Sequence, residues 1–203
     1  MRRSENKPDT ELTKAQLRTL RGHVARLAAI AATRWEDALA AENYPGEPSV
    51  WRSRLPMRAE PHHVIDCLTE VEACQAWSPV NFELDETNLL RLRAGTRVGV
   101  TGSLVGQRVR FCLEVFEANA ERLRLRAAGP VDLIAEYEVH PVTGGSHVDA
   151  ALSVRRRPGR FAAAVTRVTT VLLSGGVLER TLVRVAREAE RRQESAGLVD
   201  VST

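Results

Sequence analysis

The sequence has few cysteines and no long apolar run, and each absence excludes a class of protein. Its three cysteines among 203 residues are odd in number and form no C-x-x-C pair. Neither a disulfide framework nor a structural zinc site is therefore expected, which fits a reducing cytoplasm. No apolar stretch reaches the roughly 18 residues of a membrane span, and no apolar signal core follows the basic N-terminus. We expect a cytoplasmic protein without a transmembrane segment.

Motifs for nucleotide binding or metal binding are also missing. The sequence has no phosphate-binding loop, no dinucleotide fingerprint and no G-x-S-x-G nucleophile turn. His62 and Asp66 lie one turn apart on a predicted helix, but two ligands without a third do not predict a metal site. His140 and His147 flank a Gly144-Gly145 loop and could meet across a hairpin, where we expect them to be solvent-exposed. We expect no metal and no cofactor.

The composition is that of a soluble globular protein, with 43% hydrophobic and 27% charged residues. The length suits one domain with an extension, or at most two small domains. The net charge of +3 is unevenly spread, because residues 155–193 contain ten arginines and three glutamates, a local charge of +7. A basic helix face can meet nucleic acid or an anionic membrane. The interspersed glutamates favour a solvated face instead, and no nucleic-acid partner is expected.

An N-terminal extension over residues 1–48 contains a polar tail and a predicted helix at 10–42. Thr13 and Gln16 form a capping box at its start. An apolar stripe then runs from Leu17 to Trp35, and this stripe could pair with a partner or a second copy of the chain. Residues 12–39 are therefore a candidate homo-oligomer or partner contact.

From Val50 the hydrophobic period changes from that of a helix to that of a strand. Apolar residues alternate with polar ones in seven segments, beginning at Val50, Val80, Arg97, Arg108, Arg122, Val131 and His147. Two short helices follow the first strand, and Glu60-Pro61 marks the start of the first of them. Short turns join the later segments, which predicts a seven-stranded antiparallel sheet and an α+β fold.

The longest helical pattern spans residues 158–193. Its apolar stripe is Phe161, Val165, Val168, Leu172, Leu178, Leu182 and Val185, and it is the element best suited to cover the sheet. Ser174-Gly175-Gly176 interrupts this pattern. The glycines could break or kink the helix, pack closely on Phe111 or Trp51, or leave room for a ligand. Residues 194–203 are expected to form a flexible tail.

This order of elements resembles the helix-grip fold of the START-like (SRPBCC) superfamily, in which a sheet curves around a long C-terminal helix. Four stretches are similar to its bacterial polyketide cyclase/dehydrase-like branch: Glu60 to Ile65, Trp77-Ser78-Pro79, Gly95 to Val98 and Leu173 to Glu190. The resemblance covers about residues 49–193, which we assign to a START-like domain. The N-terminal helix lies outside the family's usual unit.

The resemblance implies a cavity between sheet and last helix that binds a hydrophobic, lipid- or polyketide-like molecule. Two alternatives stay open: a cyclase or aromatase that uses the same cavity, and an interaction protein that pairs through its N-terminal helix. The expected lining is Trp51, Ser53, Phe82, Phe111, Leu113, Tyr137, Leu152, Val168, Leu172, Gly175 and Gly176. Tyr137 is the one catalytic candidate, because its hydroxyl could orient a carbonyl or enol. The sequence leaves open whether the protein is an enzyme.

Overall fold

A computed structural model describes residues 47–200 except 87 and 105–106. The predicted helix at 10–42, its Leu17–Trp35 stripe and the candidate contact at 12–39 lie outside these residues. No single helix in the described part is long and apolar enough to cross a membrane. The two C-terminal helices pass that test of length and composition together, but the chain bends by 64° between them.

Seven strands form one antiparallel sheet, as the alternation predicts. They are β1 (Ser49–Met57), β2 (Phe82–Leu84), β3 (Arg97–Leu104), β4 (Gln107–Ala118), β5 (Arg122–Ala128), β6 (Val131–Val142) and β7 (Gly145–Arg156). Their spatial order is β1-β7-β6-β5-β4-β3-β2, so only β1 is displaced from chain order. A bulge between Val115 and Glu117 lets β4 continue to Ala118. The predicted α+β class is confirmed.

Two short helices follow β1, as predicted: α3 (Pro61–Thr69) and α4 (Val71–Trp77). Glu60 is the N-cap of α3 and Pro61 occupies its first turn, where a missing N–H costs nothing. The C-terminal pattern forms two helices, α5 (Arg160–Ser174) and α6 (Val177–Asp200). Helix α6 extends past Gln193, where the sequence pattern places its end.

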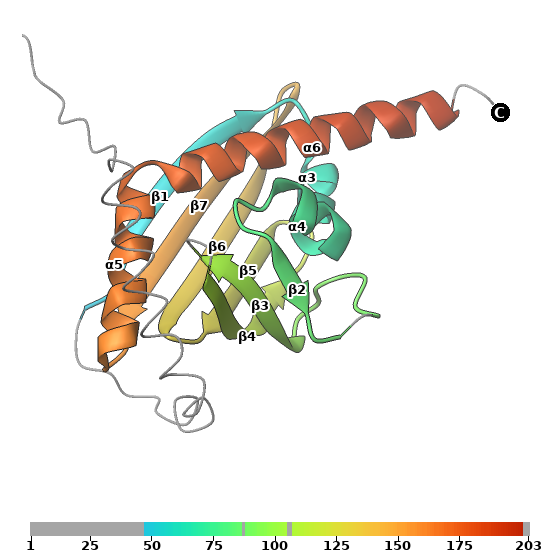
Figure 1. Cartoon of the computed structure of the whole chain (residues 1–203). Helices are drawn as coiled ribbons and strands as arrows, with labels where there is room; N and C mark the ends of the chain where they lie inside the picture. Colours follow the sequence, from blue (N-terminus) through green and yellow to red (C-terminus); the bar gives the residue numbers. More distant parts are fainter. Residues whose placement is uncertain (1–46, 87, 105–106, 201–203) are drawn as a thin grey trace, which may run out of the picture.

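The four described helices all lie on one face of the sheet, which we call the inner face (Figure 1). Helix α5 lies beside β1 and β7, and α6 runs from there across the sheet toward α3 and α4. A seven-stranded antiparallel sheet covered on one face by C-terminal helices is the helix-grip fold. The buried core joins α3 and α6 to the strands through Val64, Leu68, Leu123, Val148 and Leu182.

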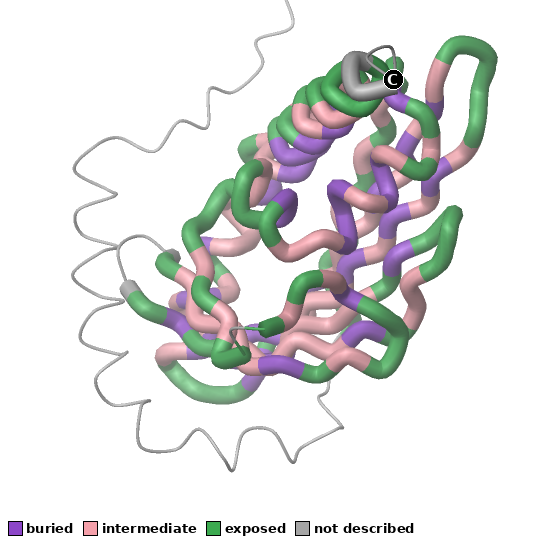
Figure 2. Tube along the Cα trace, turned by 90° about the vertical axis from the view of Figure 1, so that its right-hand side faces the viewer, coloured by how far each residue is buried: buried purple, intermediate pink, exposed green. Residues whose placement is uncertain are grey.

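The outer face carries charged residues paired across neighbouring strands. Arg124 Nε lies 2.8 Å from Glu136 Oε1, and Arg126 Nε lies 2.7 Å from Asp132 Oδ1. The exposed Arg124–Glu136 pair contributes little to stability, whereas Asp132 is buried at 6% exposure; both pairs show which face the polar half of the alternation occupies. Figure 2 shows the resulting change of burial from residue to residue along the strands.

Candidate functional site

The strand register brings most of the predicted lining residues to the inner face. Trp51 on β1 lies opposite Leu152 on β7, and Ser53 lies opposite Ala150, which in turn faces Tyr137 on β6. Antiparallel partners share a face, so these four predicted residues form one contiguous patch. Alternation in the sequence predicts that these side chains face inward, and the strand pairing shows which of them are neighbours.

The remaining strand residues of the prediction lie on the same face but farther along the sheet. Leu113 on β4 is paired with Ala127 on β5, and Phe111 is paired with Val100 on β3. Phe82 on β2 lies opposite Gly102. The predicted strand residues therefore fall into two groups, one on β1, β7 and β6 and one on β4 and β2.

Burial along the inner face is uneven. Strand residues beneath α3 and α6 are fully buried, including Leu123, Val139 and Val148. Other apolar side chains on the same face stay half-buried: Trp51, Phe111, Leu113, Leu125, Leu133 and Leu152. We call these six the half-buried apolar patch. Leu125 and Leu133 were missed as site residues, although their alternation had already placed them inward.

The predicted lining residues on the helices also differ in burial. Val168 on α5 is buried, whereas Leu172 is half-buried. Helix α5 therefore packs on the sheet along one side and leaves its other side partly exposed. Phe161 at its start is also half-buried and joins the core from the same helix.

Gly175 and Gly176 break the C-terminal helix. Gly176 has φ of +77°, a conformation that glycine adopts readily and L-residues with side chains adopt rarely. The Gly175 N–H donates to the Val171 carbonyl and ends α5, and the Arg180 N–H donates to the Gly176 carbonyl and begins α6. The break allows the 64° bend between the helices.

The alternative in which these glycines pack closely on Phe111 or Trp51 is wrong. A Cβ added to Gly175 would meet only carbonyl oxygens of its own helix among the described residues, and one added to Gly176 would meet only Glu179. Phe111 packs instead on Gly129, where an added Cβ would lie 2.5 Å from the ring. That contact joins β4 to the β5–β6 turn, and it cannot be predicted from the sequence without the strand register.

Tyr137 is the polar residue at the border between the buried and half-buried parts of the face. It is 9% exposed, and its hydroxyl makes no hydrogen bond among the described residues. Burial raises the pKa of Tyr137 to about 12, with a smaller contribution from Cys74. The phenol is therefore protonated at neutral pH, so it can donate a hydrogen bond but cannot act as a base.

The two cysteines above Tyr137 are structural. Burial raises the pKa of both Cys67 and Cys74 to about 12, so neither is a reactive thiolate at neutral pH. The Cys74 thiol donates to the Leu68 carbonyl at 3.3 Å, and Trp77 Nε1 donates to the Cys67 carbonyl at 2.8 Å. These bonds fix the corner between α3 and α4.

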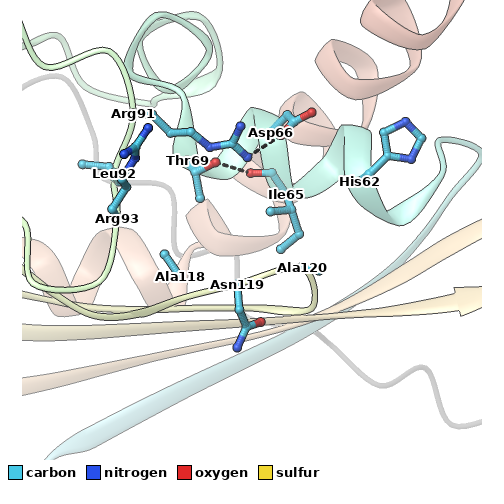
Figure 3. Close-up of a pocket in the computed structure, with 10 residues that line it drawn as sticks. All are labelled: His62, Ile65, Asp66, Thr69, Arg91, Leu92, Arg93, Ala118, Asn119 and Ala120. Carbon is cyan, nitrogen blue, oxygen red and sulfur yellow. Dashed lines mark hydrogen bonds and ion pairs between the residues drawn. The ribbon is translucent and has the colours of Figure 1, made fainter.

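A separate pocket of about 330 Å³ lies between α3, residues 91–93 and the β4–β5 turn (Figure 3). Its lining mixes apolar Ile65 and Leu92 with charged groups, and the Arg91 guanidinium pairs with Asp66. The sequence had placed Asp66 one turn from His62, and the structure gives it a cationic partner. Charged walls make this pocket a poor match for a wholly apolar molecule. The loop residues were missed because they follow no period.

Comparison with known proteins finds the fold and no family. No protein-family model matches the chain, and no curated protein matches it in sequence. TTHA0849 from Thermus thermophilus is 18% identical with a TM-score of 0.54, covering 71% of this chain and 99% of that one. SA2116 from Staphylococcus aureus, described as of unknown function, is 12% identical with a TM-score of 0.54, covering 75% and 99%. CV1439 from Chromobacterium violaceum is 16% identical with a TM-score of 0.52, covering 70% and 96%. At these identities the likeness shows a shared fold alone.

Proposed function

We propose that this chain binds a hydrophobic small molecule, lipid-like or polyketide-like, between the inner face of the sheet and helices α5 and α6. The observation that carries the proposal is the half-buried apolar patch. Each 100 Å² of such surface that a ligand removes from water contributes about 2.5 kcal/mol before the costs of association. A bound apolar molecule would bury the side chains that α5 leaves partly exposed.

Two polar groups give the proposed site a means of orienting its ligand. Ser53 and the protonated Tyr137 lie on the inner face two strands apart, both paired with Ala150. A few placed hydroxyls in an otherwise apolar lining are typical of sites that bind a hydrophobic molecule with one carbonyl or hydroxyl. The predicted Val168, Leu172, Gly175 and Gly176 would border this site from the helical side.

The resemblance to the polyketide cyclase/dehydrase-like branch of the START-like superfamily supports the same ligand class. A cyclase or aromatase is the second candidate, and Tyr137, a protonated phenol on the inner face, favours it. Such an enzyme also needs a base. The inward positions of the described strands contain no His, Asp or Glu, so Tyr137 would act there as a hydrogen-bond or proton donor. We therefore rank binding first.

A pair of neighbouring substitutions on β7 tests the binding site. Leu152→Trp adds bulk to the half-buried apolar patch, whereas Ala151→Trp adds the same side chain on the outer face. We expect Leu152→Trp to weaken binding of anilinonaphthalene sulfonate, measured by fluorescence titration, by at least tenfold. Ala151→Trp should bind as the wild type does. Equal affinities for all three proteins would place the probe elsewhere and overturn the proposed site.

Native mass spectrometry of the full chain, purified from its own host, tests the ligand class. A retained mass that extracts into organic solvent is expected, and its fragmentation would distinguish a lipid from a polyketide. A chain that carries nothing and does not bind the probe would contradict the binding function.

A further inference from the structure

The β6–β7 hairpin gathers three metal-binding side chains on the outer face, away from the proposed ligand site. His140 on β6 lies directly opposite His147 on β7. Asp149 follows His147 by two residues and therefore points to the same side of the sheet. The two imidazole rings lie 4.7 Å apart between centroids and are tilted by 32°.

Two of the three separations between donor atoms are close to those of ligands around one ion. Nε2 of His147 lies 3.4 Å from Asp149 Oδ2, and Nε2 of His140 lies 3.6 Å from the same oxygen. In a tetrahedral zinc site with bonds near 2.0–2.1 Å, two ligand atoms are separated by about 3.3–3.4 Å. One donor atom from each of the three residues can be chosen so that all three lie within 4.8 Å of one another.

Arg54 holds the carboxylate in place. It lies opposite Asp149 in the β1–β7 register and donates through Nε to Oδ1 at 2.5 Å and through a second nitrogen to Oδ2 at 2.8 Å. Hydrogen-bonded carboxylates are typical of metal sites, because an outer partner fixes the orientation of the ligand. Glu138, the ion-pair partner of Arg122, adds a second carboxylate near the histidines, with its Oε2 3.8 Å from His140 Nε2.

We propose that His140, His147 and Asp149 form a binding site for a divalent transition-metal ion, with Zn²⁺ the best match. Two imidazoles and one carboxylate are a borderline donor set that suits zinc and leaves a fourth position for water or an external ligand. The side chains are 45%, 28% and 31% exposed, so the ion can enter without rearrangement of the core.

The sequence predicts no metal site, although it allows His140 and His147 to meet across a hairpin. The structure supplies the exact register that pairs His140 with His147 and places Asp149 beside them. His62 and His63 provide a natural contrast. Their rings lie 3.9 Å apart on the first turn of α3, yet no third ligand joins them within the described residues.

Zinc titration of the tag-free full chain after chelator treatment tests the site. Calorimetry near pH 7.5 should give one ion per chain, and the melting temperature should rise with zinc. We expect His140→Ala and His147→Ala each to weaken zinc binding by at least tenfold. A His62→Ala/His63→Ala double variant should keep the wild-type affinity. Because all these positions are partly exposed, circular dichroism should show every variant folded.

Cobalt supplies an independent readout. Co²⁺ bound at this site should give the visible absorption of a low-coordinate complex, and His147→Ala should abolish it. No saturation at millimolar zinc, or unchanged binding by a His140→Ala/His147→Ala variant, would overturn the proposal.

Discussion

The two ends of the inner face share one strand pattern but differ in how the helices cover them. Under α6, Leu182 and Val185 are 0% exposed against an equally buried Val64. Near α5, Leu133 and Leu152 stay half-buried although they alternate in the same way, whereas Val131 and Val154 on the same two strands are 1% and 3% exposed. The difference divides the inner face into a structural end under α6 and a half-buried part near α5, which belongs to the proposed ligand site.

Polar contacts reinforce the structural end. The backbone N–H groups of Arg58 and Glu60 donate to Glu190 and Gln193 on α6 at 3.1 and 2.8 Å. Arg192 pairs with Glu70 at the α3–α4 corner and with Glu188 on its own helix. These contacts tie α6 to both ends of the β1–α3 connection. The described part of α5 has no comparable side-chain contact to another element, so its position depends on packing.

The largest predicted effect is a difference in stability between two leucine truncations. Leu182→Ala should lower the free energy of unfolding by about 2–5 kcal/mol, because it leaves a cavity in a filled core. Leu152→Ala should cost clearly less, about 1 kcal/mol, because its side chain is already partly in contact with solvent. Urea denaturation of both variants measures the comparison. Equal losses would mean that the α5 end is as tightly packed as the α6 end.

Sequence periodicity predicted the elements better than it predicted their packing. Alternation in β6 placed Leu133 and Tyr137 inward, and both are on the inner face. The same alternation could not distinguish half-buried Leu133 from buried Val139, because burial depends on where α5 and α6 lie. The break was one of the expected outcomes at Gly175-Gly176, but its 64° angle depends on packing against the sheet. Contacts between neighbouring strands, such as the contact of Phe111 with Gly129, leave no local pattern in the sequence.

Titration of Tyr137 marks the border between the two ends. Burial of the Tyr137 side chain raises its pKa to about 12, so its neutral form is favoured in the folded protein. The raised pKa contributes stability that is present below the unfolded value near 10 and is lost as pH rises through about 12. Absorbance at the tyrosinate band should show Tyr137 ionising near pH 12, and Tyr137→Phe should remove that step. Ionisation near pH 10 in the folded protein would mean that water from the α5 end reaches the phenol.

The smallest predicted effect concerns the helix break that separates the two ends. Gly176→Ala should destabilise the protein by about 1 kcal/mol, because alanine is strained at a φ of +77°. Gly175→Ala is the matched control, since a φ of −79° suits alanine and its Cβ would meet neighbours at 3.4 Å, an ordinary contact. That variant should be neutral or slightly stabilising.

An asparagine variant at Gly176 distinguishes backbone strain from a steric requirement for glycine at this break. Asn tolerates positive φ better than alanine does, and a Cβ at Gly176 would meet nothing closer than 4.0 Å. Gly176→Asn should therefore cost less than Gly176→Ala in thermal unfolding, although its side chain is larger. The reverse order would show that the glycine is required for space rather than for its conformation. The bend between α5 and α6 would then depend on close packing, and the half-buried patch beneath α5 would need another explanation.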